Sequence, residues 1–372
     1  PAPDLGTTSP RRQVPDRPPR AANRTCRWAL SICRARGKRA FLEKDGDPDY
    51  QEEVVPGQPR RLQDDVYFLV DDLLVPEEPA SHVLHELLRK IGVGGQEAVG
   101  VGFISALRND DYVVGAYREH GQCLAKGAEA RYVMAELYGK ATGISKGKGG
   151  SMHMFSKERH FYGGHGIVGA QVPLGAGLAF AHKYREDGGV CMAYFGDGAA
   201  NQGQVYESFN MAELWSLPAI YVIENNRYAM GTAVTRASAQ TDFSKRGVSF
   251  NIPGEQVDGM DVQAVREAGL RAMEFARTGK GPYILEMQTY RYRGHSMSDP
   301  AKYRSKDEVD KMRNEHDPID QVRERLLKKH KIAEDEIKKI DAEVRRIVNE
   351  SAEFATVDPE PDVAELWTDI TL

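Results

Sequence analysis

Residues 190–228 read VCMAYFGDGAANQGQVYESFNMAELWSLPAIYVIENNRY. The opening apolar run ends at Gly196-Asp197-Gly198, a pattern typical of a buried strand followed by a tight turn. Over residues 202–215, large apolar side chains recur near helical spacing, and Pro218 ends that pattern. A second apolar run covers residues 219–223. We therefore expect a strand, a helix and a second strand parallel to the first.

Polar residues follow both of these strands. Asp197 comes after the first strand, and Asn225-Asn226 comes after the second. Because parallel strands end at the same edge of a sheet, these side chains should converge. Either motif alone is an ordinary turn or loop, but together they suit a hard cation such as Mg²⁺, which takes about six oxygen ligands from carboxylates, amides, carbonyls, water and phosphate. The pattern predicts a metal-diphosphate site formed by Asp197, Asn226 and a nearby backbone carbonyl.

The composition is that of an ordinary α/β protein. The chain has 372 residues, 41% hydrophobic residues and a formal charge of -5, which excludes a typical nucleic-acid binder. No apolar run approaches the ~20 residues of a membrane span. The four cysteines, Cys26, Cys33, Cys123 and Cys191, form neither a disulfide framework nor a zinc pattern, which favours a reducing compartment.

The chain divides into four parts. Residues 1–60 are rich in Arg and Pro and should form an arm without a packed core, either a disordered extension or a transit peptide. Residues 61–93 have no assigned place. Residues 94–300 carry the α/β pattern, and residues 301–372 read as helices. In that last part Ser305 and Glu308 form a capping-box pattern, and we expect these helices to pack without chemistry of their own.

Two glycine-rich or basic turns precede the central stretch. The strand at residues 112–114 ends before Tyr117-Arg118, where a guanidinium is well placed for a phosphate unless it pairs with Glu119. Residues 164–169 match the nucleotide-binding pattern G-x-G-x-x-G. A nicotinamide site would need an apolar strand before that pattern, whereas the polar residues 157–160 precede it, so we interpret the glycines as close approach to another ligand at a helix start.

A further strand at residues 284–289 leads into a loop with two arginines and His295. A histidine in a loop is often functionally silent, but this one follows a strand and stands beside hydroxyls and Asp299. The loop therefore suits anion contact and proton transfer.

From about Gly95 to its C-terminus, the chain resembles a known family, the alpha subunits of the heterotetrameric, thiamine-diphosphate-dependent pyruvate dehydrogenases of bacteria and mitochondria. The motifs that carry the resemblance are Gln96-Glu97-Ala98, Tyr117-Arg118, Lys146 to Met154, Gly163 to Gly175, Gly196 to Gly203, Glu224 to Gly231 and Tyr290 to Pro300. The resemblance implies a thiamine-diphosphate-binding α/β fold, with a parallel sheet flanked by helices and a helical C-terminal extension.

The resemblance also implies roles for individual residues. Asp197, Asn226 and the carbonyl of Tyr228 would bind Mg²⁺. His295 would be catalytic, beside the diphosphate and the reacting centre. The other residues that would contact thiamine diphosphate are Tyr117, Arg118, Gly166, Val168, Gly198 and Ala199.

Partners follow from the same resemblance. A glutamate that binds the aminopyrimidine of the cofactor is absent from the matching motifs and would come from a separate beta subunit in an α2β2 assembly. The substrate would be pyruvate, and its acetyl group would pass to a lipoyl group on the acetyltransferase component. The setting would be bacterial cytoplasm or, alternatively, the mitochondrial matrix.

Two features depart from or extend this pattern. The family has an active-site histidine shortly before Gln96, whereas this chain reads LRKIGVG over residues 88–94. Two alternatives to a pyruvate-type enzyme remain: an acetoin or branched-chain 2-oxo acid relative, or a scaffold subunit with impaired catalysis. Ser296 matches the principal site at which kinases phosphorylate mitochondrial relatives.

Overall fold

The computed structural model describes residues 94–296 and 298–370. Expectations for the arm at residues 1–60, for residues 61–93 and for the lead-in before Gly94 concern positions outside these ranges.

Within the described residues, six strands form one parallel sheet with the order β2-β1-β3-β4-β8-β7. A separate two-stranded hairpin pairs β5 with β6. This sheet confirms the predicted α/β class, and residues 190–228 supply its two central strands as expected. The strands are β1 (Tyr112–Gly115), β2 (Phe161–Gly164), β3 (Cys191–Gly196), β4 (Ala219–Asn225), β5 (Tyr228–Ala229), β6 (Thr232–Ala233), β7 (Gly254–Asp258) and β8 (Tyr283–Gln288).

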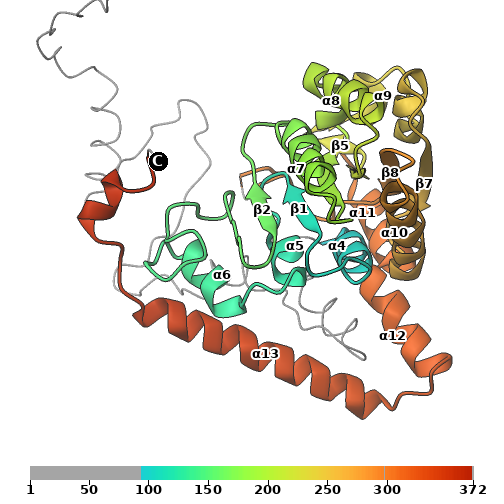
Figure 1. The fold of residues 1–372 in the computed structure, drawn as a ribbon. Helices are drawn as coiled ribbons and strands as arrows, with labels where there is room; N and C mark the ends of the chain where they lie inside the picture. The colour runs from blue at the N-terminus through green and yellow to red at the C-terminus, as the bar shows by residue number, and fades with distance from the viewer. Residues whose placement is uncertain (1–93, 297, 371–372) are drawn as a thin grey trace, which may run out of the picture. The chain divides into compact units, whose positions relative to one another are not determined.

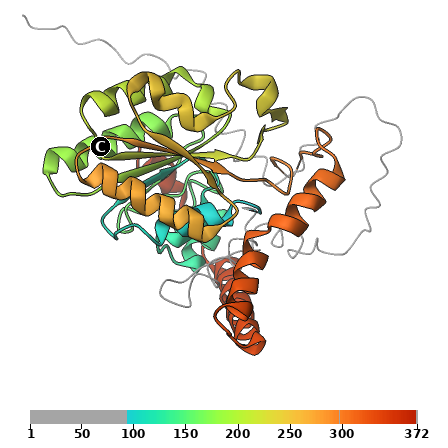
Figure 2. The ribbon, with the colours of Figure 1, turned by 90° about the vertical axis from the view of Figure 1, so that its right-hand side faces the viewer.

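Helices cover both faces of the sheet. Successive side chains of a strand point to opposite faces, so Ala193 and Phe195 pack in one core and Met192 and Tyr194 in the other. The first core is closed by α7 (Gln171–Arg185) and α8 (Gly203–Leu214), and the second by α4 (Glu97–Ile104) and α10 (Val262–Arg277). Figures 1 and 2 show the strands between these layers. Burial on both faces explains why the central strands read as continuous apolar runs.

The remaining helices connect the layers or extend them. As expected, residues from 306 onward are largely helical, and α13 packs against α6 through Val344, Val348 and Ala355.

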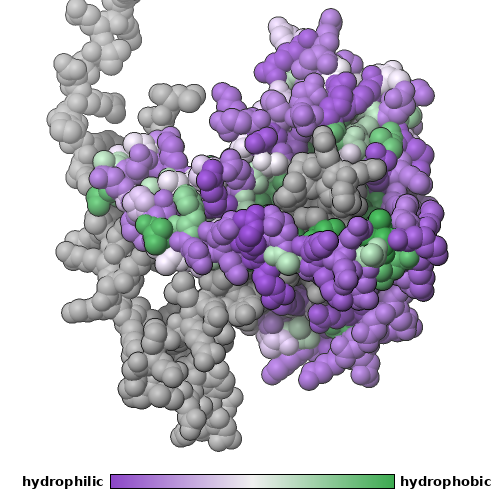
Figure 3. All heavy atoms as spheres, turned by 90° about the horizontal axis from the view of Figure 1, so that it is seen from below, coloured by the Kyte–Doolittle hydropathy of each residue, from purple (hydrophilic) through white to green (hydrophobic). Residues whose placement is uncertain are grey.

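The face in Figure 3 is largely hydrophilic. Among the described residues, no helix combines the length and apolarity that crossing a bilayer requires. Besides α4, α7, α8 and α10, the helices of the described residues are α5 (His120–Ala125), α6 (Ala130–Leu137), η1 (Ala199–Asn201), α9 (Val234–Ala237), η2 (Phe243–Phe250), α11 (Lys306–His316), α12 (Pro318–Lys328), α13 (Glu334–Val357) and η3 (Val363–Trp367).

The expectation that no strand leads into the glycines at residues 164–169 was wrong. The short strand β2 begins directly after the polar residues 157–160 and pairs with β1, placing Phe161 beside Val113. Its four residues are too few to show a period in sequence, and two of them are glycines. Context alone therefore did not exclude the nucleotide-binding pattern.

From the sequence we predict a polar loop over residues 238–254 and a helix that opens at Val257 and runs to Ala276, but the start of that helix is misplaced. Residues 254–258 form β7 at the sheet edge, and α10 begins only at Val262. In β7 only Val257 is buried, because an edge strand exposes much of its length. This polar composition hid the strand within what we had interpreted as a loop and helix start.

We expect Asp261→Ala to destabilise the fold by about 1–2 kcal/mol, because Asp261 caps α10. Its carboxylate accepts hydrogen bonds from the amides of Gln263 at 2.9 Å and Ala264 at 3.4 Å, and Arg325 Nη1 donates to it at 2.8 Å. The bond from Arg325 and these amides hold the pKa of Asp261 below its ordinary value. The stabilisation is therefore present above the unfolded pKa and is lost as the pH falls through the lower folded pKa.

Urea unfolding of wild type and variant between pH 7 and pH 3 measures this difference. Asp261→Asn is the matched control, since asparagine keeps the cap and loses only the charge. If the free energy of unfolding of the wild type exceeds that of Asp261→Ala by a constant amount down to pH 3, the assignment is contradicted.

Candidate active site

The ends of β3 and β4 bring Asp197 and Asn226 together. Gly196 pairs with Glu224 in the sheet, so the residues after them share one edge. Asp197 is only 3% exposed, and the amides of Asp197 and Asn226 both hydrogen-bond to its carboxylate. The convergence predicted from sequence is present, while the role of these residues as metal ligands stays a prediction.

The electrostatics of Asp197 suit a cation. Burial raises the pKa of this carboxyl to about 6, although the two amides and the charge of Arg291 act in the opposite direction. The described residues contain no group of three or more His, Cys, Asp or Glu side chains arranged to hold a metal. A metal here would therefore take its other ligands from neutral oxygens and from a ligand phosphate, as Mg²⁺ commonly does. The donor set fits Mg²⁺, since a divalent ion would compensate the buried charge.

The carbonyl of Tyr228, the third predicted ligand, contacts an arginine that sequence reasoning had not assigned. Arg291 Nη1 donates to this oxygen at 3.1 Å, and Nη2 donates to the carbonyl of Met230 at 2.8 Å. A carbonyl oxygen has two lone pairs, so one remains for a second partner. Arg291 thereby fixes the turn that follows Asn226.

Gly198 lets the turn after Asp197 lie close to the β5–β6 hairpin. A Cβ atom at this position would lie 2.6 Å from Cβ of Ala229, which belongs to the β5 hairpin. The next residue, Ala199, is buried and begins η1. Glycine is thus required for the turn after β3 to pack on the hairpin that carries Tyr228.

Three other predicted residues form a second group. The hydroxyl of Tyr117 lies 3.2 Å from Nε2 of His295, and their rings meet edge to face at 5.9 Å. Arg118 Nη1 donates to the backbone carbonyl of His295. The alternative of an ion pair with Glu119 is not seen, because Glu119 is buried and its Oε1 accepts from the amide of Ala116 at 2.9 Å.

The surroundings of His295 favour the neutral imidazole. Burial lowers its pKa, and the charges of Arg291 and Arg118 lower it further, while Asp299 acts in the opposite direction. The amide of His295 donates to Asp299 Oδ2 at 2.6 Å, which fixes the loop around it. A neutral imidazole can accept a proton, and the imidazolium that forms can then return it, as acid-base chemistry requires.

The glycine loop at residues 164–169 lies beside Tyr117. The amide of His165 donates to the carbonyl of Ala116, and a Cβ on Gly164 would lie 2.8 Å from that carbonyl. Gly166 faces His153, whose Cε1 would lie 3.1 Å from an added Cβ. Val168 is exposed, and its carbonyl accepts from Gln204 at 3.3 Å.

Buried carboxyl groups lie beneath these loops. Glu119 and Glu224 are both buried, and burial together with the charge of Glu224 raises the pKa of Glu119 well above its ordinary value. Gln122 Nε2 donates to Glu224 Oε1 at 3.3 Å. Burial also raises the pKa of Glu224 to about 7.

The C-terminal helices do more than pack. Glu308 at the start of α11 accepts hydrogen bonds from the hydroxyls of Tyr228 at 3.0 Å and Tyr290 at 2.8 Å. Ser305 Oγ accepts from the amide of Glu308 at 3.1 Å, which is half of the expected capping box. The Glu308 side chain instead ties the two site loops to α11, a role that no sequence spacing indicated.

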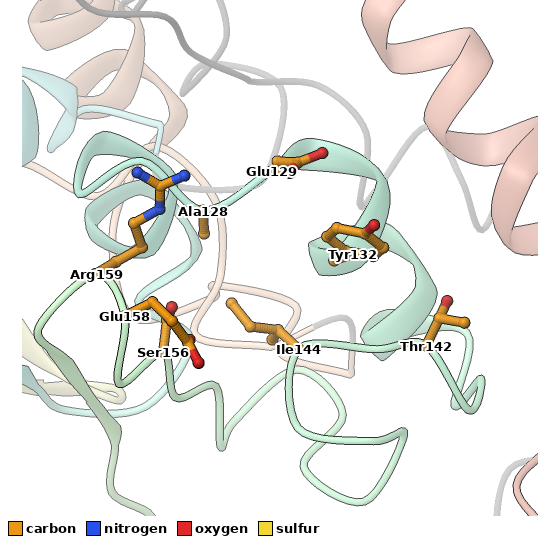
Figure 4. Close-up of a pocket in the computed structure, with 8 residues that line it drawn as sticks. All are labelled: Ala128, Glu129, Tyr132, Thr142, Ile144, Ser156, Glu158 and Arg159. Carbon is orange, nitrogen blue, oxygen red and sulfur yellow. The ribbon is translucent and has the colours of Figure 1, made fainter.

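A hollow of about 330 Å³ lies elsewhere on the chain (Figure 4). It is bounded by α6 and by the turn before β2, at the end of that strand opposite to Gly164. None of the predicted cofactor residues lines it. Its lining residues are Ala128, Glu129, Tyr132, Thr142, Ile144, Ser156, Glu158 and Arg159.

A parallel sheet with carboxylate, amide, arginine and histidine groups at the carboxyl ends of its strands defines a cofactor-dependent α/β enzyme. The family described as dehydrogenase E1 component matches residues 88–364, and the chain belongs to this family. Membership carries a dependence on thiamine diphosphate.

Curated relatives agree with this assignment. The chain is 71% identical over 278 residues to the pyruvate dehydrogenase E1 component subunit alpha of Rhizobium meliloti, covering 75% of this chain and 80% of that protein. It is 60% identical over 277 residues to the subunit of the same name in Zymomonas mobilis, covering 74% and 78%. It is 52% identical over 273 residues to the human mitochondrial somatic form, covering 73% and 69%.

Proposed function

We propose that this chain acts as the alpha subunit of a pyruvate dehydrogenase, which decarboxylates pyruvate with thiamine diphosphate and Mg²⁺ and passes the acetyl group to a lipoyl group. The observation that carries the proposal is Asp197, a buried carboxylate set against Asn226 in a chain whose relatives bear that enzyme's name. The acceptor would belong to the acetyltransferase component of the complex.

In this proposal, Asp197, the side-chain oxygen of Asn226 and the carbonyl of Tyr228 would hold Mg²⁺. Arg118 would bind the diphosphate, and its guanidinium already donates to the carbonyl of His295 in the loop after β8. The remaining residues proposed to contact the cofactor are Tyr117, Gly166, Val168, Gly198 and Ala199.

When bound, thiamine diphosphate supplies an electron sink that lets a 2-oxo acid lose CO₂. The chain's own residues would bind the cofactor and orient the groups around it. Tyr117 and Arg118 hold His295 from its ring and its carbonyl, respectively, so that the neutral imidazole can exchange a proton near the reacting centre. Burial of Asp197 excludes water from the metal side.

The proposal requires a partner. The carboxylate that would act on the pyrimidine ring has no counterpart in the motifs of this chain, so a beta subunit in an α2β2 assembly should supply it. The residues proposed for the diphosphate and the metal are all present in the sequence, and Tyr117 and Arg118 already contact His295, which argues against a scaffold subunit. Bacterial cytoplasm is the proposed setting, as the bacterial relatives suggest.

We expect pyruvate decarboxylation from the chain co-expressed with its beta subunit, and none above background from the chain alone. Assays with thiamine diphosphate, Mg²⁺ and an artificial electron acceptor, with pyruvate or 2-oxoisovalerate as substrate, measure this. A preference for 2-oxoisovalerate would identify a branched-chain 2-oxo acid, and not pyruvate, as the substrate. Robust turnover by the isolated chain would refute the shared site.

A further inference from the structure

The side chain of Asn226 is held from both ends. Its Nδ2 donates to Oε1 of Gln96 at 2.8 Å, although the two residues are separated by 130 positions in the chain. Its Oδ1 accepts from the amide of Tyr228 at 3.4 Å. Because the amide of Tyr228 can only donate and Nδ2 can only donate, these two contacts select one of the two possible orientations of the Asn226 amide.

The backbone turn that carries Gln96 is also fixed in place. It immediately precedes α4, where Oε2 of Glu97 accepts from the amide of Gly95 at 2.8 Å. Gly95 has φ of +95°, and a Cβ on it would lie 1.8 Å from the carbonyl of Tyr290. The amide of Tyr292 donates to the carbonyl of Gly94 at 3.0 Å. The turn that carries Gln96 is therefore wedged against the chain that leaves β8.

Orientation of the amide matters because only its oxygen can bind a cation. The two ends of an asparagine amide have nearly the same shape, and the wrong orientation would point two N–H bonds at the metal. Outer-shell partners that orient a metal ligand commonly change metal affinity by about 10- to 100-fold. An acceptor placed against Nδ2 excludes the wrong orientation without touching the metal.

We propose that Gln96 is a positioning residue that holds the Asn226 amide with Oδ1 available to a divalent cation, so that metal affinity depends on the acceptor at position 96. This inference rests on the proposed metal site at Asp197, Asn226 and Tyr228. It gives the Gln96-Glu97-Ala98 motif a physical role, with Glu97 anchoring the turn and Gln96 acting on the ligand.

The test uses Mn²⁺ as the probe. The chain is purified with its beta subunit, and the dissociation constant for Mn²⁺ in the presence of thiamine diphosphate is measured from the electron paramagnetic resonance signal of free Mn²⁺. Gln96→Met removes the acceptor at similar length, and we expect it to weaken Mn²⁺ binding about 10- to 100-fold. Gln96→Glu keeps an acceptor, and we expect it to bind Mn²⁺ at least as tightly as wild type.

A double-mutant cycle separates orientation from general damage. Asn226→Asp replaces the amide by a carboxylate whose two oxygens are equivalent, so orientation no longer matters. We expect Gln96→Met to weaken Mn²⁺ binding by less than about threefold in the Asn226→Asp background. Gln321→Met is the control for loss of a glutamine elsewhere, since Gln321 lies on α12 and donates to the carbonyls of Met260 and His316.

The outcomes are distinct. If wild type does not bind Mn²⁺ with thiamine diphosphate, the proposed metal site falls and the inference with it. If wild type binds and Gln96→Met binds equally well, or if Gln96→Glu weakens binding as much as Gln96→Met, only the inference is overturned. Should Gln96→Met fail to fold by circular dichroism, Gln96→Ala replaces it in the same cycle.

Discussion

Asp197→Ala should abolish Mg²⁺-dependent binding of thiamine diphosphate, with a loss of affinity of at least about 100-fold. Asp197 is the only proposed protein ligand with a negative charge, and the other two are neutral oxygens. The substitution removes the charge that a divalent ion would neutralise, and it leaves the amides of Asp197 and Asn226 without their acceptor. Catalysis should fall below detection at cofactor concentrations that saturate the wild type.

Isothermal titration calorimetry with thiamine diphosphate, in the presence and absence of Mg²⁺, measures this loss. Asp110→Ala is the matched control, because Asp110 is exposed and pairs with Arg108 on the surface, at 3.4 Å. Near-normal affinity in Asp197→Ala would remove Asp197 from the metal site. A variant that binds the cofactor equally with and without Mg²⁺ would show that the metal acts elsewhere.

Ser296→Glu should inhibit pyruvate turnover strongly, although the residue takes no part in the proposed chemistry. Ser296 follows His295, whose carbonyl Arg118 binds and whose ring contacts Tyr117. A carboxylate there would stand beside the cofactor's diphosphate and compete for Arg118. For unit charges ~8 Å apart at an effective dielectric constant of ~20, the repulsion is about 2 kcal/mol, or roughly 30-fold in binding. A phosphate on Ser296, with about twice the charge, should act more strongly.

Ser298→Glu provides the comparison within the same loop. Ser298 is exposed, and its hydroxyl lies 3.1 Å from that of Ser296, so it tests charge in the loop without adjacency to His295. We expect a smaller loss for Ser298→Glu, and wild-type cofactor affinity for Ser296→Ala. The rate and the thiamine diphosphate affinity are read together, with salt varied. Full turnover by Ser296→Glu would show that this loop does not lie over the diphosphate.

Much of the fold was predictable because its signals are local. The runs before Asp197 and Asn226 are apolar on both faces of their strands, since helices cover both sides of the sheet. The apolar residues of the helix between them recur at helical spacing, and Gly196 and Pro218 lie on either side of this helix. A periodic run, a turn and a second run define β3, α8 and β4 without knowledge of any distant residue.

The missed elements lacked such signals. β2 contains four residues and β7 five, and the exposed positions of β7 are polar. What makes each a strand is its hydrogen-bonded neighbour, β1 for the first and β8 for the second. An edge strand therefore depends on a pairing partner that lies far away in the chain, and its own composition carries little of the information.

The residue types of the candidate site follow from the sequence, because Asp197 and Asn226 come directly after recognisable strands and Tyr117-Arg118 and His295 stand in motifs that resemble a known family. The arrangement of these residues relative to one another does not follow from the sequence. Tyr117 meets His295 across 178 positions, and Asn226 meets Gln96 across 130. Such contacts arise only in the folded chain, where turns and strand ends from distant positions meet, and a hydrogen bond between distant side chains leaves no periodicity in the chain. The tertiary structure alone thus decides that Arg291 binds the carbonyl of Tyr228 and that Glu308 joins two loops.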